Sequence, residues 1–227
     1  MTYNDFVGTS DRGNTSNIEI GRLALGQLSE EHLVELKAVF SHAYHNGHMY
    51  EDFLKDLTEN PEVFQTFLAR QDDRLIGVMV IESKPHSFIN YHQFPPIHLK
   101  RFTVLPQFRR RGVGKGLLDD AKGYAFDESG IKVIFGESNE AGALSFYGRE
   151  DALFSVDVIK NYSKRNTPEE NLSFFREFIS NPKFAAYRFP EGDGIQFVFC
   201  KSEDETKFFR QHGFVSKQEL ISDLKFV

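Results

Sequence analysis

The segment from Val104 to Leu118 restricts the possible folds more than any other part of the chain. A strand-like stretch, residues 97–104, runs into Pro106, and three consecutive arginines, two glycines separated by one residue and a helical pattern follow it (VLPQFRRRGVGKGLL). The start of a helix presents unpaired backbone N–H groups and a partial positive charge, and glycines let a ligand approach the backbone closely. Guanidinium groups add bidentate recognition of phosphate. The segment therefore predicts a strand, a turn and a helix whose first turn binds a diphosphate.

Two common nucleotide-binding loops do not fit this segment. A Walker loop needs a wider glycine spacing and a Ser or Thr hydroxyl for magnesium, both of which are missing here. A dinucleotide-binding loop needs a third glycine, and Leu117 stands at that position. A basic turn without function would explain the arginines, but it would not explain Pro106, the glycine pair and the preceding strand together.

The core of the segment, Arg109-x-x-Gly112-x-Gly114, resembles the acyl-CoA-binding motif Q/R-x-x-G-x-G/A of the GCN5-related N-acetyltransferases (GNAT). The family's usual strand ending, V-x-P, is present as Val104-Leu105-Pro106. The resemblance implies an α/β fold with a mixed, mostly antiparallel central sheet and flanking helices. It also implies that acetyl-CoA, the co-substrate, binds in a cleft between two splayed strands.

The resemblance further implies which residues bind the cofactor. Backbone groups around Phe102, Thr103 and Val104 would hold the pantetheine arm. The diphosphate would be held by the following residues: Arg109, Arg110, Arg111, Gly112, Val113, Gly114 and Lys115. Asn139 lies near the position of an asparagine in the family and is assigned to cofactor binding on the same ground.

The order of the expected elements agrees with this fold. A strand near 18–25, two helices, a hairpin within 66–81 and the strand 97–104 precede the diphosphate turn, and a helix and the strand 131–136 follow it. We expect three regions: a mobile tail at 1–17, an acetyltransferase core at 18–150, and a C-terminal extension at 151–227 that completes or is appended to the same domain. Within the extension, residues 184–200 have the pattern of a second hairpin. A weak similarity between 133–154 and 198–215 is too short to be identified as a repeat.

Acyl transfer to an amine requires a neutral amine, a polarised thioester carbonyl and a proton for the leaving thiolate. The resemblance implies a tyrosine as proton donor, in an A-x-x-[FL]-Y pattern on the helix after the next strand. Residues 139–147 match this pattern at Ala143, Phe146 and Tyr147 but lack the Gly-Phe pair that usually follows. Residues 205–214 end in that pair, but phenylalanine occupies the tyrosine position. We favour Tyr147, because it supplies the chemistry. The stretch 205–214 remains the alternative position for this helix of the family.

The general base is less clearly indicated. The family often has a glutamate on the strand before the diphosphate turn, where this chain has Lys100 and Arg101. Glu137 follows the next strand and could accept a proton through water, although an exposed carboxylate without function explains it equally well. His98 is a further option.

The histidine-rich segment at 42–48 raises the question of a metal site. His42 and His45 are three residues apart and could share a helix face. No second histidine pair or cysteine pair accompanies them, so we expect no metal. Polar and aromatic residues here, such as Tyr44, fit the border of an acceptor pocket.

Composition and charge limit the classes of protein to which the chain can belong. The net charge of −6 argues against a broad nucleic-acid footprint, and no apolar run approaches the 18 residues of a membrane span. The single cysteine, Cys200, has the setting of a buried small hydrophobe and suits a reducing cytoplasm. The 24 phenylalanines indicate core packing.

The sequence thus predicts a cytoplasmic enzyme that moves an acetyl group from acetyl-CoA directly to the amine of a small molecule or to a protein amino group. The alternatives are a non-catalytic acyl-CoA-binding sensor or interaction domain of the same fold, and an acyltransferase that uses longer acyl chains. Homodimerisation is possible. The acceptor lies beyond sequence reasoning, because specificity lies in loops that differ freely within a fold.

Overall fold

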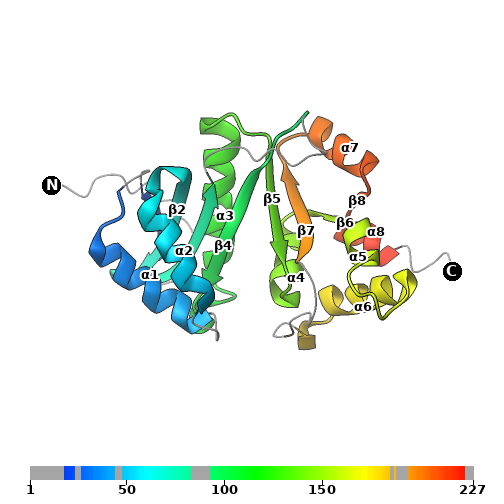
Figure 1. Cartoon of the computed structure of the whole chain (residues 1–227), viewed down its shortest axis with the longest axis horizontal. Helices are drawn as coiled ribbons and strands as arrows, with labels where there is room; N and C mark the ends of the chain where they lie inside the picture. Colours follow the sequence, from blue (N-terminus) through cyan, green and yellow to red (C-terminus); the bar gives the residue numbers. More distant parts are fainter. Residues whose placement is uncertain are drawn as a thin grey trace. The chain divides into compact units, whose positions relative to one another are not determined.

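The computed structural model describes residues 18–23, 27–43, 48–82, 93–184, 187 and 194–222, which form two compact units (Figure 1). The first unit contains the described residues up to 82 together with Ile97–Ile131. The second contains residues 93–96 and the described residues from Lys132 onward. The expected tail at 1–17 lies outside the described residues.

The first unit is built on four antiparallel strands in the order β1-β2-β3-β4. The strands are β1 (Ile18–Leu23), β2 (Phe64–Gln71), β3 (Arg74–Glu82) and β4 (Ile97–Val104). Asp72 and Asp73 join β2 to β3 with φ angles of 50° and 62°, the left-handed pair that a two-residue hairpin turn requires. The expected hairpin within 66–81 is therefore confirmed.

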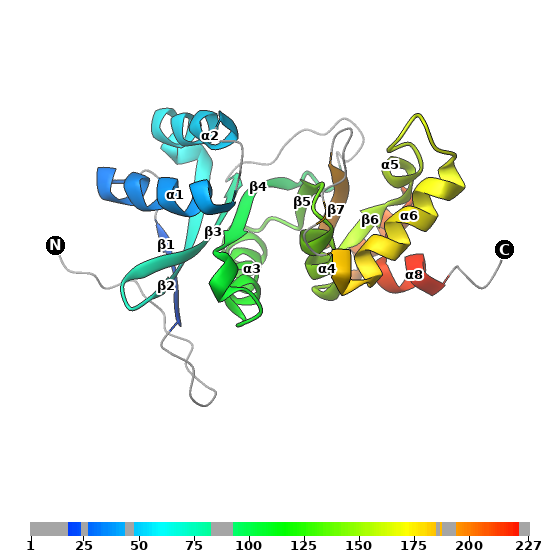
Figure 2. The ribbon, with the colours of Figure 1, turned by 90° about the horizontal axis from the view of Figure 1, so that it is seen from below.

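Helices cover both faces of this sheet (Figure 2). They are α1 (Glu30–Ala43), α2 (His48–Glu59) and α3 (Val113–Gly123), with short turns η1 (Pro61–Val63) and η2 (Pro106–Phe108) and a π-helical turn η3 (Tyr124–Glu128). Phe40 of α1 and Leu57 of α2 are fully buried in one core with Val78 and Val80 of β3. Gly77, which directly precedes Val78 on β3, faces α3 instead, because successive side chains of a strand point to opposite faces.

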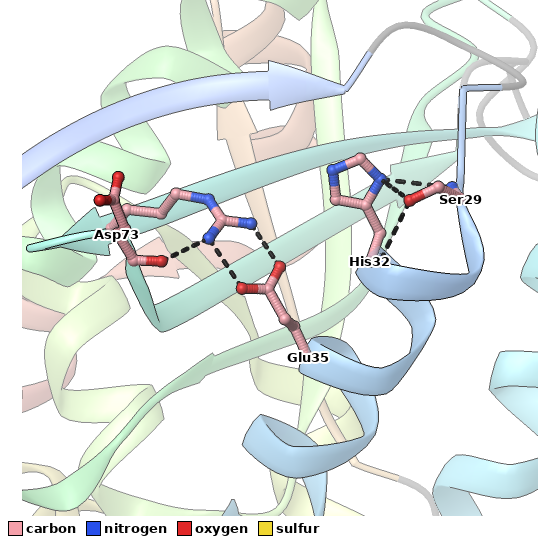
Figure 3. A network of polar contacts seen from close by, with 5 residues as sticks. Ser29, His32, Glu35 and Asp73 are labelled. Carbon is pink, nitrogen blue, oxygen red and sulfur yellow. Dashed lines mark hydrogen bonds and ion pairs between the residues drawn. The ribbon is translucent and has the colours of Figure 1, made fainter.

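A polar network fastens α1 to the sheet (Figure 3). The guanidinium of Arg70 on β2 forms a bidentate ion pair with Glu35, in which Nη1 lies 2.8 Å from Oε1, and it also donates to the carbonyl of Asp73 at 2.8 Å. At the start of the helix, the Ser29 hydroxyl accepts the His32 amide while His32 Nδ1 accepts the Ser29 amide, both at 3.2 Å. This reciprocal cap satisfies two amides that the helix itself cannot pair.

The second unit contains four further strands in the order β5-β7-β6-β8, again with antiparallel pairing. Its elements are β5 (Val133–Ser138), α4 (Ala141–Arg149), β6 (Leu153–Ser155), α5 (Val156–Lys160), α6 (Pro168–Ser180), η4 (Pro182–Phe184), β7 (Ile195–Cys200), α7 (Glu203–Gln211), β8 (Phe214–Ser216) and α8 (Lys217–Ser222). Residues 185, 186 and 188–193 of the expected hairpin at 184–200 lie outside the described residues. Of the rest, Phe184 ends the turn η4, and β7, the expected second strand, pairs with β5 and β6. Phenylalanines such as Phe135, Phe209 and Phe214 fill the core, as composition indicated.

The second unit repeats one pattern of elements twice. β5-α4-β6-α5 and β7-α7-β8-α8 each consist of a strand of six residues, a helix of nine, a strand of three and a short helix. A residue with positive φ precedes each short strand, Asp151 at 66° and Gly213 at 79°. The final short helices both begin after a serine, Ser155 and Ser216, whose hydroxyl accepts an amide of the helix. The weak similarity between 133–154 and 198–215 falls within this repeated pattern.

No helix in the described part of the chain has both the length and the apolar character of a membrane span.

Candidate functional site

The turn between β4 and α3 is held by one backbone hydrogen bond to β3 and by short-range backbone hydrogen bonds within the turn. The Leu105 amide donates to the Ile76 carbonyl on β3 at 2.9 Å, which fixes the end of β4 against its neighbour. The Phe108 amide donates to Leu105 at 2.9 Å and the Arg109 amide donates to Pro106 at 3.3 Å. The sequence VLPQFR therefore folds into a strand end and one 3-10 turn, as expected from the proline at its start.

Two left-handed residues then direct the chain into α3. Arg110 has a φ of 62°, and Gly112, the N-cap, has a φ of 84°. A Cβ built on Gly112 would meet nothing within 4 Å, so the glycine is needed for its backbone angle and not for space. Gly112 provides no side-chain hydrogen bond to cap the helix. The first amides of α3 thus lack the side-chain acceptor that an N-cap usually supplies, which is the condition for anion binding at a helix start.

The cations around this turn have different partners. Arg109 Nε donates to the Val104 carbonyl at 3.0 Å, so this side chain ties the turn back to the end of β4. The Arg111 guanidinium lies 5.6 Å from the ring centroid of Phe108, within the range of a cation–π contact. Lys115 Nζ lies 3.0 Å from Asp119 Oδ2, one helical turn further on. All three residues are exposed, and the carboxylate of Asp119 partly compensates the charge of Lys115.

Close packing sets the position of α3. A Cβ on Gly77 would lie 3.1 Å from Leu117 Cδ1, 3.1 Å from Val113 Cγ1 and 3.3 Å from the Thr103 carbonyl. The helix therefore approaches β3 at a place where no side chain intervenes, beside the strand that leads to the turn. Sequence reasoning missed Gly77; its only signal is a glycine within an otherwise apolar strand.

β4 contains a bulge just before the residues assigned to the pantetheine arm. Val80 pairs with Arg101 and Ile81 with Leu99, which leaves Lys100 without an opposite residue. Lys100 Nζ lies 2.6 Å from Glu82 Oε1, and the two side chains are 29 % and 8 % exposed. Phe102 is half-buried and Thr103 and Val104 are buried. Glu82, a buried carboxylate beside this strand, is a residue that the sequence analysis did not single out.

Tyr147 lies on α4 in the second unit and is 3 % exposed. Its ring stacks on Phe197 at a centroid distance of 4.2 Å and meets Phe199 edge-on at 6.0 Å. Gly136 makes room for Phe197, since a Cβ there would be 2.4 Å from Phe197 Cζ. In the rival helix α7, Phe209 is fully buried and packs edge-on against Phe214. Tyr147 and Phe209 both occupy the seventh position of their helices.

The remaining predicted residues are distributed over both units. Glu137 is exposed at the end of β5 and accepts a hydrogen bond from Gln196 Nε2 at 3.1 Å, and Asn139, exposed as well, follows two residues later. His98 is half-buried on β4 of the first unit. The His42 ring bonds to the Ala38 carbonyl through Nδ1 at 2.7 Å, whereas Tyr44 and His45 lie outside the described residues. The described residues include no group of three or more potential metal ligands from His, Cys, Asp and Glu.

An antiparallel sheet with helices on both faces and an uncapped helix start after a V-x-P strand end defines an α/β protein with a candidate anion site. Residues 30–150 match the family model described as the acetyltransferase (GNAT) family. The match covers more than half of the chain, so the chain belongs to the GNAT acetyltransferase family.

Solved structures have the same fold at low sequence identity. A GNAT-family protein from Desulfovibrio desulfuricans is 13 % identical, with 82 % of this chain and 99 % of that chain aligned and a TM-score of 0.53. An acetyltransferase from Streptococcus agalactiae 2603 is 14 % identical, with 81 % and 98 % aligned and a TM-score of 0.53. A GNAT-family acetyltransferase from Staphylococcus aureus Mu50 is 14 % identical, with 81 % and 99 % aligned and a TM-score of 0.52. No protein of curated function matches the chain significantly.

Proposed function

We propose that this chain transfers an acetyl group from acetyl-CoA directly to an amine. The observation that carries the proposal is the turn at 105–112, where left-handed Arg110 and Gly112 deliver the start of α3 without a side-chain cap, in a chain of the GNAT family. A helix start of this kind stabilises a diphosphate by its amides and its partial positive charge.

In this proposal the turn and β4 bind successive parts of the cofactor. The amides of Val113, Gly114 and Lys115 and the guanidinium groups of Arg110 and Arg111 would hold the diphosphate. Arg109 contributes mainly by holding the turn, because its Nε already donates to Val104. Backbone groups of Phe102, Thr103 and Val104 would accompany the pantetheine arm. Its direction, from the turn back along β4, would bring the thioester toward the bulge at Lys100.

The proton transfers are assigned to two residues of the second unit. Tyr147 would donate a proton to the leaving thiolate, and Glu137 would take one from the attacking amine through water. The family match supports Tyr147 over the rival helix, because it extends to residue 150 and leaves 203–213 outside. A phenyl ring at Phe209 has no proton to donate. Asn139 would contribute to cofactor binding.

The acceptor in this proposal is the amine of a small molecule or a protein amino group. One observation favours the second candidate function, an acyl-CoA-binding domain without catalysis. Tyr147 is buried and stacks on Phe197, which is also the environment of an aromatic residue that only packs in a core.

Two measurements separate these functions. Acetyl-CoA should raise the melting temperature of the wild-type chain under either function, and an Arg110→Gln/Arg111→Gln variant should lose most of that shift. Release of free CoA in the presence of a panel of amines should occur only if the chain is an enzyme. Absence of any acetyl-CoA stabilisation would overturn both.

A further inference from the structure

Two cations of the second unit converge on a single hydroxyl. Arg149 Nη1 and Lys217 Nζ each donate to Ser145 Oγ at 3.2 Å. Ser145 and Arg149 lie one helical turn apart on α4, and Lys217 is the first residue of α8. We call these three residues the cation pair site.

The fold holds the lysine in this place. A Cβ on Gly148 would lie 2.9 Å from Lys217 Cδ and 3.0 Å from Lys217 Cβ, so the lysine stem packs where the glycine leaves space. Burial lowers the pKa of Lys217, and the neighbouring Arg149 charge lowers it further. The ammonium is thus kept near a like charge by packing and not by attraction.

No carboxylate compensates these charges within the described part of the chain. Neither Arg149 nor Lys217 has an ion pair there, and the Ser145 hydroxyl is the hydrogen-bond acceptor for both side chains. Glu219, on the same helix as Lys217, is instead 3.1 Å from Arg210 and accepts the Ser216 amide at 2.7 Å. The two converging cations are therefore not balanced by the carboxylate on α8.

We propose that Ser145, Arg149 and Lys217 bind the phosphate group of a phosphorylated ligand. The site offers a guanidinium, an ammonium and a hydroxyl hydrogen, and a phosphate dianion has the charge and the number of acceptor oxygens to engage all three. A single carboxylate carries only half of that charge. The site lies within the second unit and does not depend on the acetyl-CoA proposal.

Inorganic phosphate is the probe for the test. Potassium phosphate is titrated into the full, 15N-labelled chain, with potassium chloride and potassium acetate at matched ionic strength as parallel titrations. We expect saturable shifts of the amide signals of residues 145–149 and 217 with phosphate only. Lys217→Met and Arg149→Gln should each weaken this binding by at least about tenfold, because each removes a charge-assisted hydrogen bond.

Matched variants keep the outcome tied to this site. Lys132→Met removes another lysine of the second unit, one that lies near Glu205, and should leave the phosphate affinity within about twofold of the wild type, since its charge is already partly compensated. Arg111→Gln, in the diphosphate turn, should leave the shifts at 145–149 unchanged, so failure of acetyl-CoA binding would not affect this result. Ser145→Ala, which retains both cations, provides a folded variant if Lys217→Met is unstable, and it should also weaken binding. The proposal is overturned if no saturable shift occurs, if chloride or acetate produces the same shifts, or if the folded site variants bind as the wild type does.

Discussion

Lys100 Nζ lies 2.6 Å from Glu82 Oε1, so the bulged residue of β4 is joined to the buried last residue of β3. The carboxylate is 8 % exposed and the ammonium 29 %. The pair therefore ties the two strands together at the place where their regular pairing is interrupted.

Removing the carboxylate should destabilise the chain through the lysine left behind. Glu82→Gln deprives a partly buried ammonium of its counter-charge, and we expect a loss of about 1–3 kcal/mol in the free energy of unfolding, below the range for fully buried pairs because Lys100 keeps some water. Urea denaturation measures this value. Replacing both residues, as Glu82→Gln/Lys100→Met, should recover part of the loss.

The control for this pair is an exposed one. Lys115→Met removes the partner of Asp119 at the surface, and its effect should not exceed about 0.5 kcal/mol. Equal losses in the free energy of unfolding for the two single variants would show that the Glu82–Lys100 pair contributes no more stability than a surface pair.

The backbone angle of Gly112 provides a second test. Its φ of 84° is unfavourable for any side chain, and most of all for a β-branched one, so Gly112→Val should cost about 1–2 kcal/mol of stability. The same change should displace the amides at the start of α3 and weaken acetyl-CoA binding by about tenfold, which corresponds to the loss of one good hydrogen bond. Thermal shift and calorimetric titration measure the two effects.

Gly123 is the matched control, because it lies at the end of the same helix. It has a helical φ of −56°, and a Cβ there would meet nothing within 4 Å. Gly123→Ala should therefore stabilise the chain by about 0.5–1 kcal/mol and leave acetyl-CoA binding unchanged. Normal cofactor affinity in Gly112→Val would remove this turn from the binding site.

Removing only the hydroxyl oxygen of Tyr147 separates a role in proton transfer from a role in packing. Tyr147→Phe keeps the ring that stacks on Phe197, so the fold should persist, whereas Tyr147→Ala would open a cavity and cost about 3–5 kcal/mol. If the hydroxyl donates a proton, turnover should fall by about 10²–10⁴-fold with acetyl-CoA affinity retained. Full turnover in Tyr147→Phe would assign the ring to the core alone. Phe209→Leu in α7 should change stability but not the pH dependence of turnover.

Local features of this chain could be derived from sequence, and long-range ones could not. The turn after Val104 was predictable because the hydrogen bonds within it join residues three apart and its shape depends largely on one proline and one glycine. The Asp72-Asp73 hairpin follows the same logic. The residues near Tyr147 show where this logic ends, since β7, which carries Phe197, pairs with strands that precede it by more than 40 residues. An apolar pattern fixes that such a strand exists but not which strand it joins.

The same limit explains why Glu82 was overlooked. From the sequence alone, a glutamate at the end of an apolar strand is expected to be exposed to solvent. Only the bulge at Lys100 brings a lysine within reach of it. A bulge depends on the register of two strands, which side-chain alternation alone does not specify.

The Cys200 thiol offers a test of the core of the second unit. Burial raises its pKa from 9.0 to about 12, with a smaller opposing effect from its hydrogen bond with Thr206. At pH 8 the thiolate fraction in the folded chain should then be at least about 100-fold lower than in the unfolded chain, and alkylation by iodoacetamide should be slower by a similar factor. The unfolded thiol ionises first as the pH rises, so this group's contribution to stability is complete below pH 9.0 and is lost as the pH rises toward about 12. Alkylation rates with and without urea measure the difference, and a Cys200→Ser variant, which cannot be alkylated there, identifies the reacting group. A native rate equal to the rate in urea would mean that β7 is not packed as described.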